Sequence, residues 1–184
     1  MLEIRRLAEA ELDGFLQFMD GPAFRSQPRW QGCYCQTYLN TAEQNDDPES
    51  YASLNRKRAC DRTRDGTMQG YLALEGEKVV GWMAANSFKN FAALPLDSED
   101  TAAIICFVVE REHQGRGIAT SLLQYALSDL PTLGYKAASA APLASGEFHD
   151  WGYRGPRSMF EKAGFRAGPM LDEKHILIDR KSVV

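Results

Sequence analysis

Two glycines at the start of a predicted helix are the residues of this chain with the clearest chemical potential. They stand in the run Gln-Gly-Arg-Gly-Ile-Ala at residues 114–119. The first backbone N–H groups of a helix have no partner within the helix, and the helix dipole places partial positive charge there. Glycines leave room for an anion to approach these groups because they carry no Cβ. Arg116 adds a full positive charge. The run therefore predicts a cradle for a phosphate or diphosphate.

A buried strand and an amphipathic helix are the elements that must position this cradle. Residues 104–109 form a continuous apolar run rich in β-branched side chains, which predicts a strand buried on both faces. A short charged turn, Glu110-Arg111-Glu112, follows it. Apolar residues then recur every four positions between Ile118 and Leu130, which predicts one apolar helix face.

Three kinds of anion cradle compete for this junction. The nucleoside-triphosphate loop needs a Gly-Lys-Ser/Thr sequence after its glycines, and the chain has no such lysine here. The dinucleotide fingerprint needs a small third residue where Thr120 stands. The third is an acyl-coenzyme A loop. Gln114-x-x-Gly117-x-Ala119 resembles the Gln/Arg-x-x-Gly-x-Gly/Ala signature of the GNAT acetyltransferases. A glycine-bearing turn without a ligand is the remaining alternative.

Composition and charge narrow the class of protein. The chain has 184 residues, of which 44% are hydrophobic and 25% charged, values typical of one globular domain. The net charge of −4 gives no positive field that would attract nucleic acid or an anionic membrane. No apolar run approaches the roughly 20 residues that cross a bilayer, and the N-terminus has no signal-peptide core. We therefore predict a cytoplasmic protein with no nucleic-acid or membrane partner.

Four cysteines could hold a metal or form disulfides. In a reducing compartment Cys33, Cys35, Cys60 and Cys106 are expected to be free thiols. Cys33-x-Cys35 is spaced too tightly for an ordinary zinc knuckle, and neither a second Cys pair nor a nearby His completes four ligands. No metal is expected, and a zinc site is the alternative.

Patterning predicts a mixed series of strands and helices along the whole chain. Gly81 within the second hairpin strand predicts a bulge or a close backbone approach. Residues 23–45 are irregular and dense in aromatics, and Asp47-Pro48 predicts the start of a helix. We expect strands at 2–6, 68–74, 78–85, 104–109, 135–141, 165–171 and 174–179, helices at 12–19, after 47, at 118–130 and at 156–163, and loops at 88–101 and 142–155.

The order of these elements resembles the GNAT fold over nearly the whole chain. The run Met-Phe-Glu-Lys-Ala-Gly-Phe at 159–165 is similar to the late-helix pattern of that family, and Val79-Val80-Gly81-Trp82 is similar to its Val-x-Gly-aromatic strand. The Trp-x-x-Cys-x-Cys stretch at 30–35 resembles a bacterial subgroup without a known substrate. The resemblance implies an α/β fold, a single domain spanning 1–184 with a mixed, mostly antiparallel central sheet and helices on both faces.

This resemblance also implies an enzyme, an N-acetyltransferase that moves an acetyl group from acetyl-coenzyme A to a primary amine by direct attack. Residues of the strand would lie along the pantetheine arm, the loop would hold the diphosphate, and the late helix would flank the other side. The implied cofactor-binding residues are Phe107, Val108, Val109, Gln114, Gly115, Arg116, Gly117, Ile118, Ala119, Thr120, Ser158, Phe160 and Lys162.

The catalytic groups are less clearly marked. The family often has a tyrosine that protonates the departing thiolate at the position of Phe160, and phenylalanine has no proton to give. The polar loop that follows the strand at 135–141 offers Tyr153 as an acid and His149 as a base. The alternative is that Tyr153 and His149 have no catalytic role, because polar loops of this length commonly contain such residues. Covalent transfer through Cys33 or Cys35 is an alternative to direct attack.

The resemblance implies an acceptor pocket walled by the loop before the central strand and by aromatic residues of the irregular stretch, Phe24, Trp30, Tyr34 and Tyr38. Trp30, Tyr34 and Tyr38 are the candidate pocket residues. Such residues stack on planar groups or cations, and they also pack in ordinary cores. The acceptor is expected to be a small-molecule or peptide amine, and the chain a monomer or homodimer. A coenzyme A-binding sensor without catalysis is the alternative function, motivated by Phe160.

Overall fold

One seven-stranded sheet runs through the molecule in the order β1-β2-β3-β4-β5-β7-β6. The computed structural model describes residues 1–92, 98–145 and 152–180. Neighbouring strands are antiparallel except for the parallel pair β4 and β5. The strands are β1 Leu2–Arg6, β2 Gly70–Glu75, β3 Lys78–Ser87, β4 Thr101–Val109, β5 Ala137–Ala140, β6 Arg166–Met170 and β7 Ile176–Arg180.

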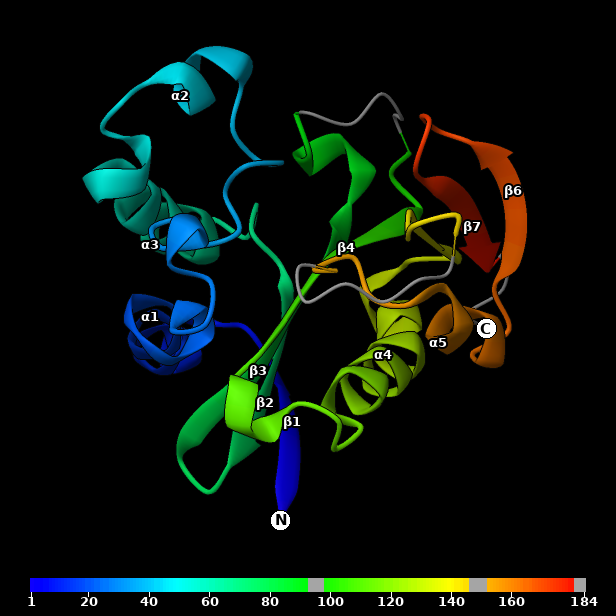
Figure 1. The fold of residues 1–184 in the computed structure, drawn as a ribbon, viewed down its shortest axis with the longest axis horizontal. Helices are drawn as coiled ribbons and strands as arrows, with labels where there is room; N and C mark the ends of the chain where they lie inside the picture. The colour runs from blue at the N-terminus through cyan, green and yellow to red at the C-terminus, as the bar shows by residue number, and fades with distance from the viewer. Residues whose placement is uncertain (93–97, 146–151, 181–184) are drawn as a thin grey trace.

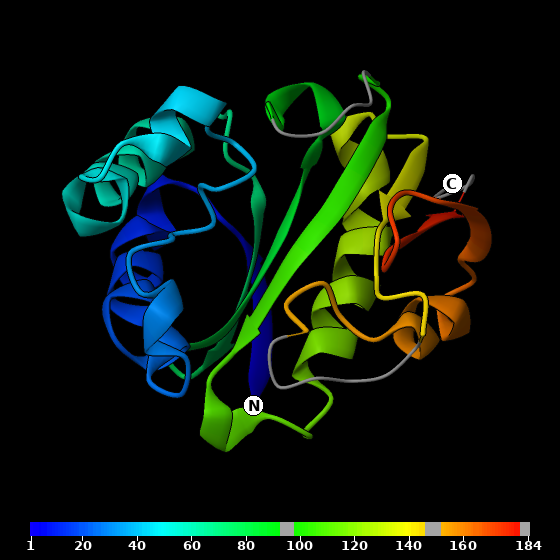
Figure 2. The ribbon, with the colours of Figure 1, turned by 45° about the horizontal axis from the view of Figure 1, so that its top comes forward.

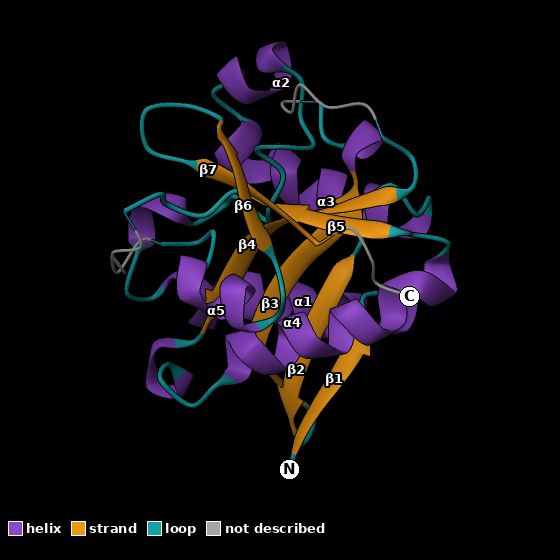
Figure 3. Ribbon diagram, turned by 90° about the vertical axis from the view of Figure 1, so that its right-hand side faces the viewer, coloured by secondary structure: helices purple, strands orange, loops and turns teal. Residues whose placement is uncertain are grey.

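Helices cover both faces of this sheet. The helices are α1 Leu12–Asp20, α2 Ala42–Asp46, α3 Asn55–Arg64, α4 Ile118–Asp129 and α5 Arg157–Lys162. Helices α1 and α3 lie on one face and α4 and α5 on the other (Figures 1 and 2). The longest, α4, lies across strands β1 to β4 (Figure 3). The predicted fold class, a mixed and mostly antiparallel sheet with helices on both faces, is confirmed.

The N-terminal segment differs from the sequence-based prediction in two places. Helix α2 lies in the stretch that was expected to be irregular, and a capping box starts it: Gln44 N donates to Thr41 Oγ1 at 3.3 Å and Thr41 N donates to Gln44 Oε1 at 3.1 Å. The helix expected after Asp47 begins as a π-helical turn, Ser50–Leu54, and becomes regular only at Asn55. The Thr-x-x-Gln pattern was the signal for α2.

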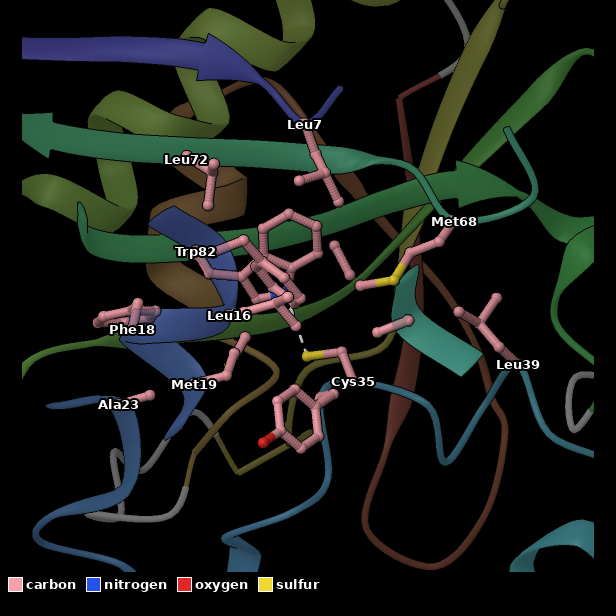
Figure 4. Close-up of a cluster of buried hydrophobic side chains, with 14 of the residues drawn as sticks. Leu7, Leu16, Phe18, Met19, Ala23, Cys35, Leu39, Met68, Leu72 and Trp82 are labelled. Atoms are coloured by element: carbon pink, nitrogen blue, oxygen red, sulfur yellow. Dashed lines mark hydrogen bonds between the residues drawn. The ribbon is translucent and has the colours of Figure 1, made fainter. Parts of the chain in front are cut away.

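Two apolar layers hold the helices against the sheet. On the side of α1, Trp82 is fully buried, packs on Phe15 with ring centroids 4.9 Å apart, and donates its Nε1–H to Cys35 Sγ at 3.0 Å (Figure 4). On the side of α4, Leu122 and Leu123 are fully buried. Trp82 thereby ties the cysteine-containing segment to the sheet.

The start of α4 packs closely on β3 at Gly81. A Cβ at this position would lie 3.0 Å from Ile118 Cγ2, in the first turn of α4. Val80, next to it, is the extra residue at a register shift opposite Ala73 and Leu74. The bulge predicted at this glycine is found at the adjacent Val80, and the atoms near the Gly81 Cβ position belong to side chains, not to another backbone.

Strands β4 and β5 pair only at one end. Thr101–Ile104 pairs with Ala137–Ala140, and β4 then continues alone on that edge. The edge is bridged by a different segment, because Phe107 N donates to Tyr153 O at 2.6 Å. Strand β4 therefore runs on past the end of β5 toward the residues of the predicted cradle.

Candidate active site

The predicted anion cradle has two glycines in the left-handed backbone region just before α4. Gly117 caps the start of α4 with φ of +80°, no side chain caps the helix, and Gly115 has φ of +74°. Both values favour glycine because they fall in the left-handed region. A Cβ built at either position would meet nothing within 4 Å. The amides of the first turn therefore face space that an anion could fill.

The cradle opens into a cleft with a volume of about 280 Å³. Strand β4, the start of α4, the segment before α5 and the segment after α1 form its walls. Nine predicted cofactor residues line the cleft: Phe107, Val108, Val109, Gln114, Gly115, Gly117, Ile118, Ala119 and Thr120. Residues not predicted for this role also line it, among them His113, Gly152, Pro156 and Met159. Their only sequence signal was their nearness to the motif or the late helix.

Four predicted cofactor residues, Arg116, Ser158, Phe160 and Lys162, are not among the described residues that line the cleft. Ser158 and Lys162 are exposed on α5, and Phe160 is fully buried between the rings of Phe107 and Phe165, at 5.9 and 5.2 Å. Arg116 is half-exposed and donates to Glu75 Oε1 at 2.6 Å. These four are outside the described cleft lining, because α5 turns its apolar side inward and Arg116 leans toward the β2–β3 turn.

A second cavity, which we call the acceptor cavity, lies on the α1 side of the sheet and has a volume of about 170 Å³. Of the predicted pocket residues, Trp30 and Tyr38 line it. Tyr34 is outside its described lining, and its hydroxyl donates to Asp20. The lining consists of Phe24, Trp30, Cys33, Cys35, Thr37, Tyr38, Tyr51, Ala84, Phe91, Ile105, Cys106, Val108 and Tyr153.

A bulge in β4 places two successive residues on the wall of the acceptor cavity. Cys106 pairs with Ala84 and Ile104 with Ala85, so Ile105 is the extra residue. Strand residues normally alternate between faces, but a bulge lets two neighbours point to the same side. This is why Cys106 joins Ile105 in the wall, which strand alternation alone would not predict.

The cleft and the acceptor cavity meet at four shared residues, Phe24, Trp30, Val108 and Tyr153. Tyr153 packs edge-to-face on Trp30 with centroids 5.5 Å apart. Its hydroxyl lies 2.9 Å from that of Tyr38. A molecule in the cleft and a molecule in the acceptor cavity would therefore meet beside the Tyr153 ring.

A half-buried cation, Arg154, contacts this pair of phenols. Arg154 Nη2 donates to Tyr38 Oη at 2.5 Å, and its guanidinium carbon lies 5.3 Å from the centroid of the Tyr38 ring. Guanidinium only donates, and either phenol can donate in the bond between Tyr38 and Tyr153. When Tyr38 donates, the Tyr153 hydrogen is left for the junction. Burial raises the pKa of Tyr38, and the Arg154 charge opposes that rise in part. Tyr38 is therefore protonated at neutral pH.

Comparison with known proteins identifies the family. A family model described as the acetyltransferase (GNAT) family matches residues 33–153, about two thirds of the chain. The chain belongs to the GNAT acetyltransferase family. Acyl transfer is therefore the chemistry of this fold, and the chain is an acyltransferase of that family. A comparison with curated protein sequences gave no match.

Solved structures similar to this GNAT protein cover almost its whole length. PaiA N-acetyltransferase from Thermoplasma acidophilum, solved in complex with coenzyme A, has a TM-score of 0.60 and 16% identity over 98% of this chain and 99% of its own. Ribosomal-protein-alanine N-acetyltransferase from Brucella melitensis has a TM-score of 0.59 and 15% identity over 97% and 99%. An aminoglycoside 6′-acetyltransferase type Ii has a TM-score of 0.59 and 14% identity, over 99% of this chain and 97% of its own. At these sequence identities, the structural similarity establishes the fold alone.

The ion pair of Arg116 bears on anion binding by this GNAT protein. Glu75→Gln is expected to tighten binding of acetyl-coenzyme A about two- to fivefold, because it frees Arg116 from a partly exposed ion pair worth about 0.2–1 kcal/mol. Calorimetric titration measures the change. Glu77→Gln, an exposed neighbour in the same turn, removes equal charge without touching Arg116 in the described structure and is the control. Equal effects of the two variants would contradict a specific role for the pair.

Two of the thiols that line the acceptor cavity of this GNAT protein, Cys33 and Cys35, have raised pKa values. Burial raises the pKa of Cys33. A contact with Cys106, with the two sulfurs 3.2 Å apart, and burial raise the pKa of Cys35 well above its ordinary value. A raised pKa lowers the thiolate fraction at neutral pH, and the thiolate is the nucleophile. These shifts favour direct transfer over an acyl-cysteine intermediate.

Alkylation would test this assignment. At pH 8, iodoacetamide is expected to label Cys33 and Cys35 at least about tenfold more slowly in native protein than in guanidinium-unfolded protein, because a thiol with a raised pKa holds less thiolate at that pH. Peptide mass spectrometry follows each cysteine separately, and the native rate should rise as the pH rises. Native labelling of either residue as fast as in the unfolded chain would show that it is available as a nucleophile.

Two further features complete the description of the site. The predicted base His149 lies outside the residues that the structure describes. Among residues 1–92, 98–145 and 152–180, no group of three or more His, Cys, Asp or Glu side chains is arranged to hold a metal ion. Within the same ranges, no helix has both the length and the apolar character that crossing a membrane requires.

Proposed function

We propose that this protein transfers an acetyl group from acetyl-coenzyme A to the primary amine of a small molecule or peptide by direct attack, and that residues 1–184 form one domain for this reaction. The observation that carries the proposal is the meeting of two cavities. An anion cradle leads into one cleft, and that cleft adjoins a second cavity at Phe24, Trp30, Val108 and Tyr153.

The cleft residues fit the donor. Open space beside Gly115 and Gly117 suits a diphosphate at the first-turn amides of α4, with Thr120 beside it. Residues Phe107 to Val109 would lie along the pantetheine arm, as in the family pattern. The donor supplies a thioester carbonyl that an amine nitrogen attacks, with cleavage of the carbon–sulfur bond and departure of the thiolate.

We assign the proton transfers to residues of this chain. Tyr153 would donate its proton to the departing sulfur, and Tyr38 and Arg154 would orient it through the 2.9 and 2.5 Å hydrogen bonds. This fills the role that the family tyrosine would have at position 160, where Phe160 is buried in the core. His149 stays the predicted base for the amine. A drop in the acetylation rate of His149→Ala at saturating acetyl-coenzyme A would support that assignment.

The alternative is a coenzyme A-binding sensor without catalysis, which the phenylalanine at position 160 favours. A thiol-release assay with acetyl-coenzyme A and a panel of amines separates the two functions, alongside calorimetric titration of the donor. The enzyme is expected to bind the donor and to release thiol only when an amine is present. Binding without release for every amine would support the sensor, and absence of binding by folded protein would contradict both.

A further inference from the structure

The acceptor cavity has the size of one aromatic ring. Its volume is about 170 Å³. A cavity of about 150 Å³ lined by apolar side chains holds benzene, which gives the scale. A single planar ring fits within this volume, whereas an aminoglycoside, with several sugar rings, would have to extend beyond it. The size of the described cavity thus favours a small acceptor.

The walls of this cavity are apolar and aromatic. Trp30, Tyr38, Tyr51 and Phe91 contribute rings to it, and Ile105 contributes an aliphatic wall from the bulge in β4. Aromatic pairs prefer edge-to-face or offset contacts and gain about 0.5–1.5 kcal/mol beyond area burial. A planar ring would be held from several sides by such contacts, and an extended aliphatic chain would gain less from them.

Charge in and around the cavity disfavours a polycation. None of the described residues that line it is Asp, Glu, Lys or Arg. An ammonium group buried without a counter-charge is costly, so a polyamine or aminoglycoside would need carboxylates in this wall. Among the described residues, Arg154 donates to Tyr38, and the guanidinium carbon of Arg29 lies 5.3 Å from the centroid of the Trp30 ring. Both groups next to the wall have the same sign as an ammonium.

A polar pair marks the end of the cavity away from the cleft. Tyr51 Oη and Thr37 Oγ1 lie 2.9 Å apart, and both residues line the cavity without lining the cleft. Trp30 and Tyr153 line both spaces, so they mark the opposite end. An acceptor would therefore direct its amine toward Tyr153 and its ring toward Tyr51, where a ring hydroxyl could bond to the polar pair.

We propose that the acceptor is a primary amine on a short alkyl arm attached to one aromatic ring, an arylalkylamine. This inference rests on the proposed acetyl transfer and adds the substrate class to it. In the balanced reaction, the amine nitrogen bonds to the acetyl carbon as the carbon–sulfur bond breaks. The nitrogen loses one proton to a base, and the coenzyme A sulfur gains one to leave as the free thiol.

The experiment compares phenethylamine, tyramine, spermidine, kanamycin and an alanine-terminated peptide as acceptors. Thiol release gives kcat/KM for each, and calorimetry with coenzyme A-loaded protein gives the affinity for each amine. We expect kcat/KM for phenethylamine or tyramine to exceed that for the other three at least tenfold, with affinities in the same order. A preference for spermidine, kanamycin or the peptide would overturn the inference while leaving acetyl transfer intact.

The two assays distinguish failure of the proposed acetyl transfer from failure of the proposed substrate class. If acetyl-coenzyme A binds but no amine releases thiol, the proposed function fails, and the calorimetric order still decides the substrate class. Preferential binding of phenethylamine or tyramine would support the cavity assignment. Equal or absent binding of all five amines would overturn it.

A charge variant provides a gain-of-function test. Thr37→Asp places a carboxylate in the cavity wall, and Thr37→Asn is the neutral control of nearly the same size. The ratio of kcat/KM for spermidine to that for phenethylamine is expected to rise at least tenfold in Thr37→Asp relative to Thr37→Asn. An unchanged ratio in folded Thr37→Asp would place acceptor selection elsewhere and contradict the inference.

Discussion

Replacing Gly117 with valine is expected to weaken binding of acetyl-coenzyme A about tenfold or more, or roughly 1.4 kcal/mol for each factor of ten. Gly117 has φ of +80° at the start of α4, and its Cβ position is open. A branched side chain would fill the space proposed for the diphosphate and would disfavour the left-handed backbone that aims the amides at it. Calorimetric titration of folded protein measures the loss.

Gly66→Val is the matched control for this substitution. Gly66 has φ of +78° and likewise nothing within 4 Å of its Cβ position, but it lies outside the lining of the cleft. Both variants should lose similar stability, measured as Tm, because both force a branched residue into the same backbone region. Only Gly117→Val should lose affinity. Unchanged binding by folded Gly117→Val would contradict the cradle.

Tyr153→Phe is expected to lower kcat about 100-fold or more with little change in KM for acetyl-coenzyme A. The phenylalanine ring keeps the edge contact with Trp30, while the hydroxyl that faces the junction and bonds to Tyr38 is lost. Proton transfer by a positioned side chain contributes about 10²–10⁴-fold to a rate. Steady-state thiol release with an accepted amine separates kcat from KM.

Tyr125→Phe controls for loss of a tyrosine hydroxyl in this experiment. Tyr125 is exposed on α4 and packs on Tyr71, away from both cavities. Its substitution should leave kcat within about twofold of the native value. If Tyr153→Phe keeps the native kcat, the acid must be a different group or the thiolate must leave without protonation.

The positions of the predicted cradle and of the core strand and helix could be predicted from the sequence because each depends on residue types and spacing within a short segment. Backbone geometry at Gly117 and the apolar faces of β4 and α4 follow directly from residue types and spacing. Gly81 indicated a local irregularity, and a bulge is present at the adjacent Val80.

The acceptor side was harder to predict because it depends on contacts between distant segments. Nothing local indicates the bulge at Ile105 that turns Cys106 into the acceptor cavity. Tyr38 and Tyr153 are 115 positions apart, so their hydrogen bond appears only once the fold brings them together. Tyr34 shares the aromatic pattern of its neighbours, yet its hydroxyl bonds to Asp20 instead. Aromatic composition predicted a pocket there without selecting its members.

Amide hydrogen exchange at residues 115–120 tests the central claim most directly. The native protein would be saturated with coenzyme A or, in parallel, with pantetheine, which lacks the diphosphate. If the first-turn amides of α4 hold that group, coenzyme A should slow exchange at 115–120 at least tenfold, and pantetheine should leave it unchanged. Coenzyme A binding that leaves exchange at these amides unaltered would contradict the account.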